Sequence, residues 1–456
     1  MNGNITGGVI WKQILLFFFP IWFGTFFQQL YNTADAVIVG NFVGKGALAA
    51  VGTTAVVQNL LVGFFVGVAS GASVVISQYY GARRGKEVQR AVHTAMAMAL
   101  LGGVGIMVIG LAASRWALSI MNTPADVMED AVLYLRICFL GMVPSLIYNM
   151  GTGILRAVGD SKRPLYFLIC ASLTNIVLDV VLVAILGMGV AGAALATVAS
   201  QCVSAYMTVI SLTRTTACYR FVPSYLRLDG EMVGKIVRIG LPAGLQSVMY
   251  SLSNSVVQAS INSFGTDVVA AYTAYGKIDS VFWMTMNSFG LSITTFVGQN
   301  FGAGQYDRVK KGVRQCVLMA FVATGALMAF TLAFGSALFR LFVQDVPVIR
   351  QGVEILHYVV PFWPTYVLIE ILSGSVRGAG DSLIPMIMTS IGVCVTRILW
   401  AVTVVATVWH SLIGALACYP LSWSLTSLLF LVYYLQGGWL RRRIRVREEG
   451  QSGQPA

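Results

Sequence analysis

The feature that most restricts the fold of this chain is an internal duplication. The segment Ser77–Ala82, SQYYGA, recurs as GQNFGA at Gly298–Ala303, and Arg156–Ser161, RAVGDS, recurs as RGAGDS at Arg377–Ser382. Residues 77 and 298, like residues 156 and 377, are 221 apart. A hydrophobic chain with two related halves is typical of secondary transporters, whose folds are built from repeated helical bundles.

Composition requires this chain to lie in a membrane. Of its 456 residues, 57% are hydrophobic and 11% are charged, whereas a soluble domain carries about 25% charged residues. A membrane-spanning helix needs about 20 apolar residues. The sequence predicts an all-α integral membrane protein with twelve spanning helices, at residues 12–38, 50–78, 90–113, 130–154, 164–186, 190–213, 236–262, 270–298, 313–337, 352–376, 385–408 and 412–436.

The distribution of basic residues predicts how the chain is oriented in the membrane. Lys and Arg concentrate in the loops on the side of the amino terminus, and only Lys45, Arg115, Arg340 and Arg350 fall in the opposite loops. The positive-inside rule therefore predicts that both termini lie in the cytoplasm, in a cell (plasma) membrane. Membrane lipid, and not nucleic acid, is the expected partner of the excess positive charge.

The twelve predicted helices divide into six and six. We expect an amino-terminal lobe at residues 12–213, a cytoplasmic loop at 214–235, a carboxy-terminal lobe at 236–440, and a basic and then polar tail at 441–456. Because each lobe has an even number of spans, both enter the membrane from the same side. The lobes should then be related by pseudo-two-fold symmetry along the membrane normal, with the substrate path between them, in a monomer.

The repeated Arg-x-x-Gly-Asp-Ser motif is interpreted mainly as a turn between helices, with a gating role as the alternative. Glycine ends one helix, aspartate caps the next, and Pro164 or Pro385 sits near its first turn. Two further prolines, Pro20 and Pro242, fall inside predicted helices, where each removes a backbone hydrogen bond and permits a kink.

The amino-terminal half carries a cluster of oxygen-bearing side chains inside its predicted helices. Asp35 lies in the first helix, and Asn175 and Asp179 share one face of the fifth because they are four residues apart. Thr197 follows on the sixth helix, after a short Gly-rich turn. A carboxylate costs about 2.5–3.5 kcal/mol at the middle of a membrane helix, so it usually faces the protein interior or water.

This donor set suits Na⁺, or a proton shared between two carboxylates. The cluster is absent from the second half. At an offset of 222 residues, the equivalent positions are occupied by Val257, Arg397, Ala401 and Tyr419. A structural hydrogen-bond network would tend to survive duplication, as the turn motifs did. We therefore favour a cation or proton site over a structural network at Asp35, Asn175, Asp179 and Thr197.

The second half has other charged residues inside its helices, including Lys277, Asp279, Glu370 and Arg397. Glu370 is expected to pair with Arg397 or Lys277, either to neutralise charge or as part of a substrate or second coupling site. The candidates for substrate contact or a second-lobe polar site are Asn149, Gln246, Asn254, Lys277, Glu370 and Arg397.

The sequence gives no indication of an enzyme. The three histidines lack metal-ligand spacing, and a GxSxG elbow, an HExxH helix and a phosphate-binding loop are absent. The seven cysteines are dispersed and form no CxxC pair. We expect no cofactor apart from a coupling ion, Na⁺ or H⁺.

The combined features resemble the multidrug and toxic compound extrusion (MATE) family over nearly the whole chain. They are the twelve-helix duplication, the repeated Gln-x-x-Gly-Ala and Arg-x-x-Gly-Asp motifs, and Asp35 followed by Val39-Gly40. The resemblance implies an antiporter that exports amphipathic, often cationic drugs and toxic organic compounds by alternating access, driven by Na⁺ or H⁺. It also implies a V-shaped cavity between two lobes.

Within the family, the resemblance places a cation site of the amino-terminal lobe at Asp35, Asn175, Asp179 and Thr197. The NorM-like branch also has a carboxylate in its seventh helix. This chain has no acid there, but has Gln246, Asn254, Gln258 and Asn262. It is therefore more similar to the DinF-like branch.

Two alternatives remain open at this point. A lipid-linked oligosaccharide flippase of the same superfamily would need a strongly cationic cavity for diphosphate, and Arg397, Lys277 and Arg136 are few for that purpose. A membrane-embedded enzyme would need clustered catalytic or metal-binding residues at the membrane surface, which the sequence lacks.

Overall fold

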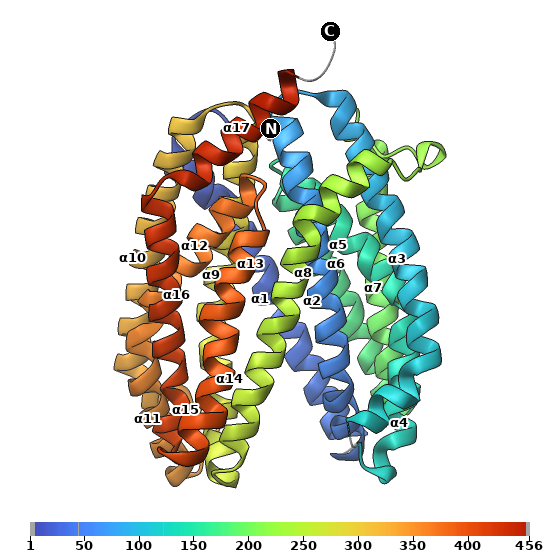
Figure 1. The fold of residues 1–456 in the computed structure, drawn as a ribbon. Coiled ribbons are helices and arrows are strands. Elements are labelled where there is room, and N and C mark those ends of the chain that lie inside the picture. Colours follow the sequence, from blue (N-terminus) through green and yellow to red (C-terminus); the bar gives the residue numbers. More distant parts are fainter. Residues whose placement is uncertain (1–4, 44, 122, 453–456) are drawn as a thin grey trace. The chain divides into compact units, whose positions relative to one another are not determined.

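The computed structural model describes residues 5–43, 45–121 and 123–452, and all secondary structure in these ranges is helical (Figure 1). The chain groups into two compact units. The first comprises residues up to Ile5 and Phe19–Gly244, and the second comprises Thr6–Phe18 and the chain from Leu245 onward. The boundaries of these units differ from those of the predicted lobes, 12–213 and 236–440. The lobe boundaries stay a prediction.

Six spans make up most of the first unit, in which α2, α3, α5, α6 and α7 pack as one bundle (Figure 1). Its helices are α1 (Ile10–Phe42), α2 (Lys45–Gly81), α3 (Gly85–Ile120), α4 (Ala125–Leu140), α5 (Met142–Ala157), α6 (Lys162–Asp179) with η1 (Val180–Ile185), α7 (Gly189–Arg214) and the short η2 (Pro223–Tyr225).

The second unit repeats this pattern around α9, which packs against α10, α11 and α12. Its helices are α8 (Gly230–Asn262), α9 (Thr266–Gly302), α10 (Tyr306–Arg340), α11 (Val346–Val359), η3 (Val360–Phe362), α12 (Trp363–Gly378), α13 (Leu383–Thr389), η4 (Ser390–Val395), α14 (Thr396–Trp400), η5 (Ala401–Val405), α15 (Leu412–Leu416), α16 (Cys418–Leu435) and α17 (Gly438–Ser452).

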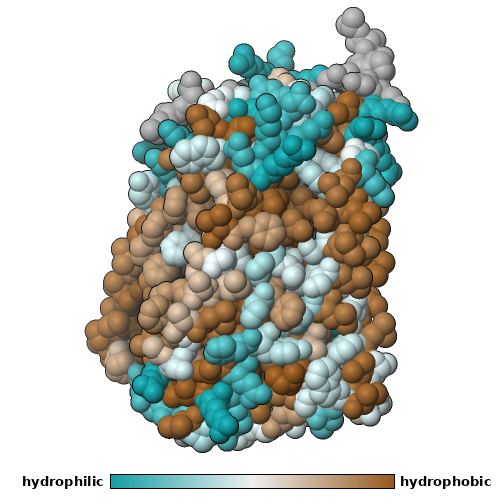
Figure 2. All heavy atoms as spheres, turned by 90° about the vertical axis from the view of Figure 1, so that its left-hand side faces the viewer, coloured by the Kyte–Doolittle hydropathy of each residue, from teal (hydrophilic) through white to brown (hydrophobic). Residues whose placement is uncertain are grey.

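The chain is a multi-pass membrane protein. Among the described residues, nine helical stretches are long and apolar enough to cross a membrane, and α4 with α5 makes a tenth, bent by 48°. The other two predicted spans correspond to α8 and α9, which are 33 and 37 residues long but too polar to pass the same test. Figure 2 shows the resulting surface on one face of the molecule, a broad hydrophobic band between hydrophilic ends.

The duplicated turn motifs fold as the sequence predicts. Gly159 and Gly380 adopt positive φ angles of 86° and 94°, a conformation that favours glycine. Asp160 Oδ1 accepts hydrogen bonds from the backbone N–H groups of Lys162 and Arg163, both at 3.1 Å, and so caps α6. Asp160 also forms an ion pair with Arg163 at 3.1 Å.

In the second copy of the motif, Asp381 accepts a bond from the N–H of Ile384 at 3.4 Å. Its ion pair, at 2.8 Å, is with Arg443 of α17. The basic tail is helical from Gly438 to Ser452 as α17. This ion pair attaches it to the rest of the second unit. Residues 453–456, the polar end of the predicted tail, lie outside the described residues.

The two helices that contain internal prolines, α1 and α8, each contribute to both units. The boundary between units falls after Phe18 in α1, next to Pro20, and after Gly244 in α8, next to Pro242. We call Thr6–Phe18 the α1 arm and Gly230–Gly244 the α8 arm. Each arm packs within the unit formed mainly by the other half of the sequence.

The α8 arm approaches α2 through glycines spaced four residues apart on both helices. A Cβ atom built on Gly71 would lie 2.5 Å from the backbone N of Gly240, and one built on Gly67 would lie 2.3 Å from the N of Gly244. Only glycine permits this backbone contact, as in other membrane helix pairs with small residues at the crossing.

Candidate functional site

The predicted cation site belongs to the first unit, where α1 and α6 supply its acids. Asp35 is half-buried on α1, while Asn175 and Asp179 are 1% and 0% exposed on α6. Asp179 is the last residue of α6, and the π-helical turn η1 follows it directly. Such π-helical turns occur frequently at functional sites because they re-aim side chains.

The structure brings the two carboxyl groups together. Asp35 and Asp179 lie close enough for a hydrogen bond between them when one is protonated. In the described part of the chain, however, Oδ1 of Asp35, both carboxyl oxygens of Asp179 and both amide atoms of Asn175 are buried without any hydrogen-bond partner. Each unsatisfied buried polar group costs about 1–3 kcal/mol. A proton or a small cation would satisfy these oxygens together.

Thr197, the fourth predicted member, is half-buried on α7, which packs beside α6. Its backbone oxygen accepts a hydrogen bond from the hydroxyl of Ser200 at 2.7 Å. No contact of its own hydroxyl with Asp35, Asn175 or Asp179 is found among the described residues. The structure thus groups the two acids and the amide, and Thr197 stays a predicted member.

Sequence reasoning missed Tyr134 of α4, which is 5% exposed and lies near both Asp35 and Asp179. Its phenol is a donor that a carboxylate can use. A tyrosine in an apolar helix has no distinctive spacing, so only the packing of α4 could have identified it. No group of three or more His, Cys, Asp or Glu within the described ranges could hold a metal ion, so any cation site here depends on two carboxylates and neutral oxygen donors.

At the repeat position of this cluster, the second unit has a positively charged side chain, Arg397. Arg397 is 1% exposed; its Nε donates to Ser422 Oγ at 3.1 Å and its Nη1 donates to Asn254 Oδ1 at 2.8 Å. The guanidinium lies 4.5 Å from the ring centre of Tyr419 and 5.8 Å from that of Trp423. Arg397 and Tyr419 are the repeat positions of Asn175 and Thr197, and π-helical η5 begins at the repeat position of Asp179, as η1 follows Asp179 itself.

The predicted pairing of Glu370 with Arg397 or Lys277 is wrong. Glu370 accepts a hydrogen bond from the hydroxyl of Tyr366 at 3.1 Å, Arg397 bonds neutral partners, and Lys277 is exposed. Glu370 packs against α9, where its carboxyl group occupies the space above Gly290. The carboxyl group and the guanidinium therefore have separate hydrogen-bond environments.

Asp279 accepts hydrogen bonds from Trp283 Nε1 at 2.6 Å and from the Tyr275 hydroxyl at 3.2 Å, so this half-buried acid of α9 is satisfied by aromatic donors. Of the other substrate candidates, Gln246 donates to Thr389 at 3.1 Å in the second unit. Asn149 lies in the first unit, donating to the carbonyl of Ser145 at 2.9 Å. Within the described part of the chain, Asn254 and Arg397 are the members of this candidate set that are hydrogen-bonded to each other.

Comparison with known proteins places these features in a family. A family model described as MatE matches residues 20–181 and 242–403, so the two matches are offset by 222 residues at both ends and begin at Pro20 and Pro242. The duplication read from the sequence is thus a repeat of the family's own unit.

Similar proteins match the chain over nearly its full length. The probable multidrug resistance protein YoeA of Bacillus subtilis (strain 168) is 29% identical over 449 residues, covering 95% of each chain. The probable multidrug resistance protein NorM of Thermotoga maritima is 24% identical, covering 96% of this chain and 95% of its own. A solved structure of a multidrug resistance MATE family transporter in an outward-facing conformation has a TM-score of 0.89 at 24% identity, covering 96% and 98% of the two chains.

Proposed function

The chain belongs to the MATE family, and from that premise we propose that it is a cation-coupled exporter of amphipathic, often cationic organic compounds. Export occurs by alternating access and is driven by entry of Na⁺ or H⁺. The chain acts as a monomer in the plasma membrane, with both termini in the cytoplasm, and performs no enzymatic reaction. The multidrug names of its relatives support this substrate class and do not favour the flippase alternative.

One observation carries the coupling part of the proposal. The carboxyl groups of Asp35 and Asp179 face each other in the first unit with buried oxygens that lack hydrogen-bond partners in the described chain. Two neighbouring carboxylates repel each other when both are ionised, and inside a membrane protein little water screens them. A bound proton or Na⁺ removes this repulsion. The coupling ion then favours the state of the protein in which the two carboxylates are neutralised. The substrate favours the state in which they carry no bound ion.

We propose that coupling is confined to the first unit. The repeat position in the second unit holds Arg397, whose charge is permanent and already hydrogen-bonded to Asn254 and Ser422. An external cation would be repelled there. The absence of an acid from residues 236–262 of α8 and this resident charge both favour a DinF-like over a NorM-like transporter.

Substrate contact is assigned to the polar helices α8 and α9. These two helices are too polar to count as membrane spans by themselves, and they present exposed polar side chains such as Asn254 and Lys277. Helices of this kind usually line a water-filled path and do not face lipid. Aromatic side chains beside them, including Trp283, suit flat organic cations.

The first prediction concerns Asp35→Asn and Asp179→Asn in proteoliposomes. Each change removes one of the two charges while keeping the shape of the side chain, so gradient-driven efflux of ethidium should fall at least tenfold, which corresponds to about 1.4 kcal/mol of coupling free energy. Imposing Na⁺ and H⁺ gradients separately identifies the coupling ion. Asp345→Asn, at an exposed position before α11, is the matched control and should transport normally.

Normal gradient-driven efflux by both variants would refute the coupling site. Absence of ethidium and fluoroquinolone movement by the parent protein under either gradient would refute the antiporter itself. Because the Asp345→Asn control makes the same chemical change outside the membrane, a general loss of charge does not explain a selective defect at Asp35 or Asp179.

A further inference from the structure

The segment 222–229, which precedes α8, forms an arch over the start of α3 within the first unit. The backbone N–H of Val222 donates to Nε2 of His93 at 3.0 Å. The other ring nitrogen of His93, Nδ1, lies 2.7 Å from the carbonyl oxygen of Gln89, so it carries the proton and donates. At the far end, the N–H of Asp229 donates to Thr94 Oγ1 at 3.3 Å. Both ends of the arch are therefore fixed to α3.

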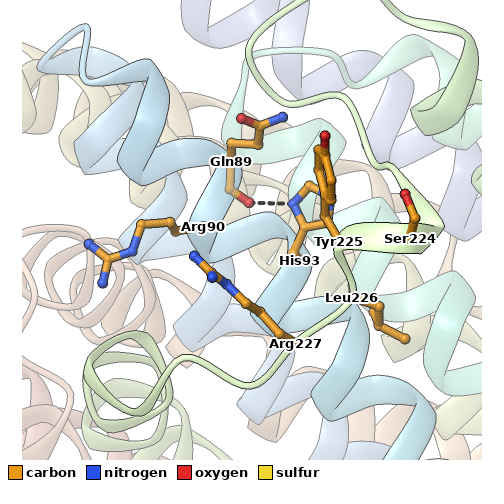
Figure 3. Close-up of a pocket in the computed structure, with 7 residues that line it drawn as sticks. All are labelled: Gln89, Arg90, His93, Ser224, Tyr225, Leu226 and Arg227. Carbon is orange, nitrogen blue, oxygen red and sulfur yellow. Dashed lines mark hydrogen bonds between the residues drawn. The ribbon is translucent and has the colours of Figure 1, made fainter.

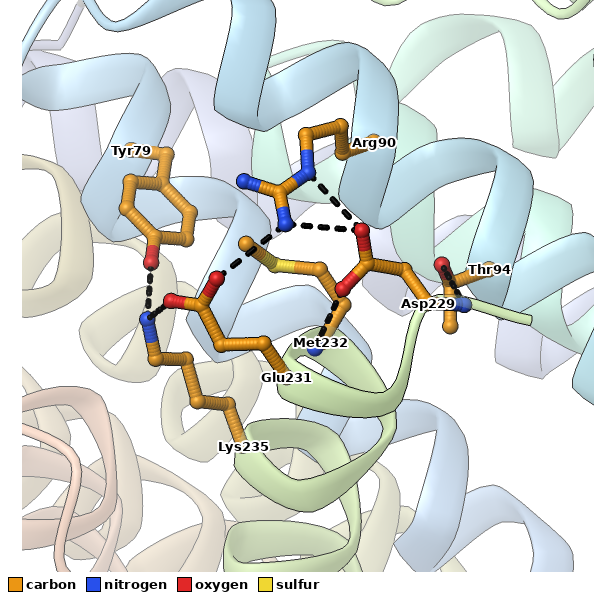
Figure 4. Close-up of polar contacts among 7 residues, drawn as sticks. All are labelled: Tyr79, Arg90, Thr94, Asp229, Glu231, Met232 and Lys235. Carbon is orange, nitrogen blue, oxygen red and sulfur yellow. Dashed lines mark hydrogen bonds and ion pairs between the residues drawn. The ribbon is translucent and has the colours of Figure 1, made fainter. Parts of the chain in front are cut away.

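Ion pairs strengthen the second attachment, as Figure 4 shows. The guanidinium of Arg90 donates to Asp229 Oδ2 at 2.9 and 2.7 Å and to Glu231 at 3.1 Å. Lys235 pairs with Glu231 and also donates to the hydroxyl of Tyr79 at 2.7 Å. Nη1 of Arg90 has no partner within the described residues, so one face of this guanidinium remains available.

A cavity of about 420 Å³ lies between the arch and α3 (Figure 3). Arg90 enters it from α3 and Arg227 from the arch, together with the polar side chains of Gln89, Ser224 and Tyr225. Arg227 is exposed and forms no ion pair or hydrogen bond in the part of the chain that the structure describes. Two guanidinium groups line this cavity. That of Arg90 is shared with Asp229 and Glu231, whereas that of Arg227 has no acidic partner among the described residues, so the cavity keeps one unpaired positive charge that is complementary to an anion.

A second cavity, of about 300 Å³ and almost wholly apolar, begins at the next residue of the arch. Leu228 lines it together with Val68 of α2, Met98 and Leu101 of α3, and Met150 of α5. Residues 89–93 of α3 line the first cavity, and residues 98–102 of the same helix line the second. At 1.5 Å per residue the two centres are about 14 Å apart along the helix. This separation fits within one leaflet, whose depth is about half of a 40–45 Å bilayer.

We propose that the two cavities together bind one anionic glycerophospholipid. Its phosphate lies between Arg90 and Arg227, with the Ser224 and Tyr225 hydroxyls as further donors, and one acyl chain enters the apolar cavity beneath Leu228. A free phosphate would use only the first cavity, whereas the adjoining apolar cavity requires an amphiphile. The site is independent of the proposed coupling site at Asp35 and Asp179.

The test is native mass spectrometry of the full-length protein in detergent, titrated with phosphatidylglycerol or phosphatidylcholine. Arg227→Ala should weaken phosphatidylglycerol binding about fivefold, the effect of one basic residue beside an anionic membrane surface. Phosphatidylcholine, which has no net charge, should bind more weakly to the parent and should respond little to this change. Arg214→Ala is the matched control, because Arg214 is also exposed, ends α7 just before the loop that leads to the arch, and lines neither cavity.

Gly102→Leu tests the acyl chain separately. A Cβ on Gly102 would meet Phe65 at 3.7 Å, an ordinary contact, so the new side chain fits and occupies the apolar cavity. This variant should retain its helical circular dichroism and lose affinity for phosphatidylglycerol. Equal binding by the parent, Arg227→Ala and Gly102→Leu would overturn the proposal. So would a loss in Arg227→Ala alone, combined with displacement of the lipid by millimolar inorganic phosphate, because that result identifies a phosphate site without a lipid chain.

Discussion

At residue 397 the second unit carries a positive charge that neutral groups hold in place. Arg397 uses the fork of its guanidinium to reach Asn254 and Ser422 while its flat face stacks on Tyr419. Lysine has the same charge but only a single ammonium group, so it cannot make this set of contacts. The residue is therefore specified by geometry as well as by charge.

Arg397→Lys should lower stability by about 1–3 kcal/mol, because at least one hydrogen bond to a charged group is lost in a buried site. Thermal unfolding in detergent, followed by circular dichroism, measures the effect. Arg350→Lys, at an exposed position in α11, is the control and should change little. An equal melting temperature for both variants would contradict the assigned role of the guanidinium fork.

Among helices, the α8 arm and α2 cross with their backbones in close contact. Gly71→Ala would place a methyl group 2.5 Å from backbone atoms of Gly240 and Ile236, which cannot move aside as a side chain can. We expect destabilisation of about 1–3 kcal/mol from overpacking. Gly105→Ala in α3 is the matched control, since a Cβ there meets nothing within 4 Å, and it should be neutral or stabilising. Unchanged thermal stability of Gly71→Ala would show that the arm does not depend on this contact.

The helices themselves were predictable because apolar length and turn chemistry are local properties. The turns at Gly159 and Gly380, and the prolines inside α1 and α8, followed from residue type alone. The 48° break between α4 and α5 was not predicted, although Pro144 lies three residues after Gly141 and falls in the first turn of α5, where proline is tolerated.

Partners across helices were less predictable than helix positions. Repeat comparison singled out Asp35 and Asp179 as members of one cluster, and the assignment of that cluster as a coupling site stays a prediction. Glu370 was assigned the wrong partner because charge complementarity does not reveal which helix faces which. Its actual donor, Tyr366, lies one helical turn earlier on α12, a spacing that the sequence did contain.

At the scale of the whole molecule, the compact units and the halves of the sequence do not coincide. The second unit includes the α1 arm, and the first includes the α8 arm. If the chain is expressed as two separate fragments, 1–215 and 216–456, each fragment lacks an arm that packs within its unit. We expect the fragments to co-purify when expressed together, and either fragment alone to aggregate. Size-exclusion chromatography of a tagged fragment with and without its untagged partner measures this, and a monodisperse fragment alone would contradict it.

The crossed arms also constrain the order in which the protein can be assembled during synthesis. The first unit lacks its last segment until Gly244 has been made, and the α1 arm is made long before the second unit to which it belongs. At a synthesis rate of 5–20 residues per second, the α1 arm waits on the order of 10–45 s for the second unit to begin at Leu245. The first unit therefore cannot finish folding while the ribosome is still translating the first half of the message. The nascent chain must keep the α1 arm unpacked until the carboxy-terminal helices have entered the membrane.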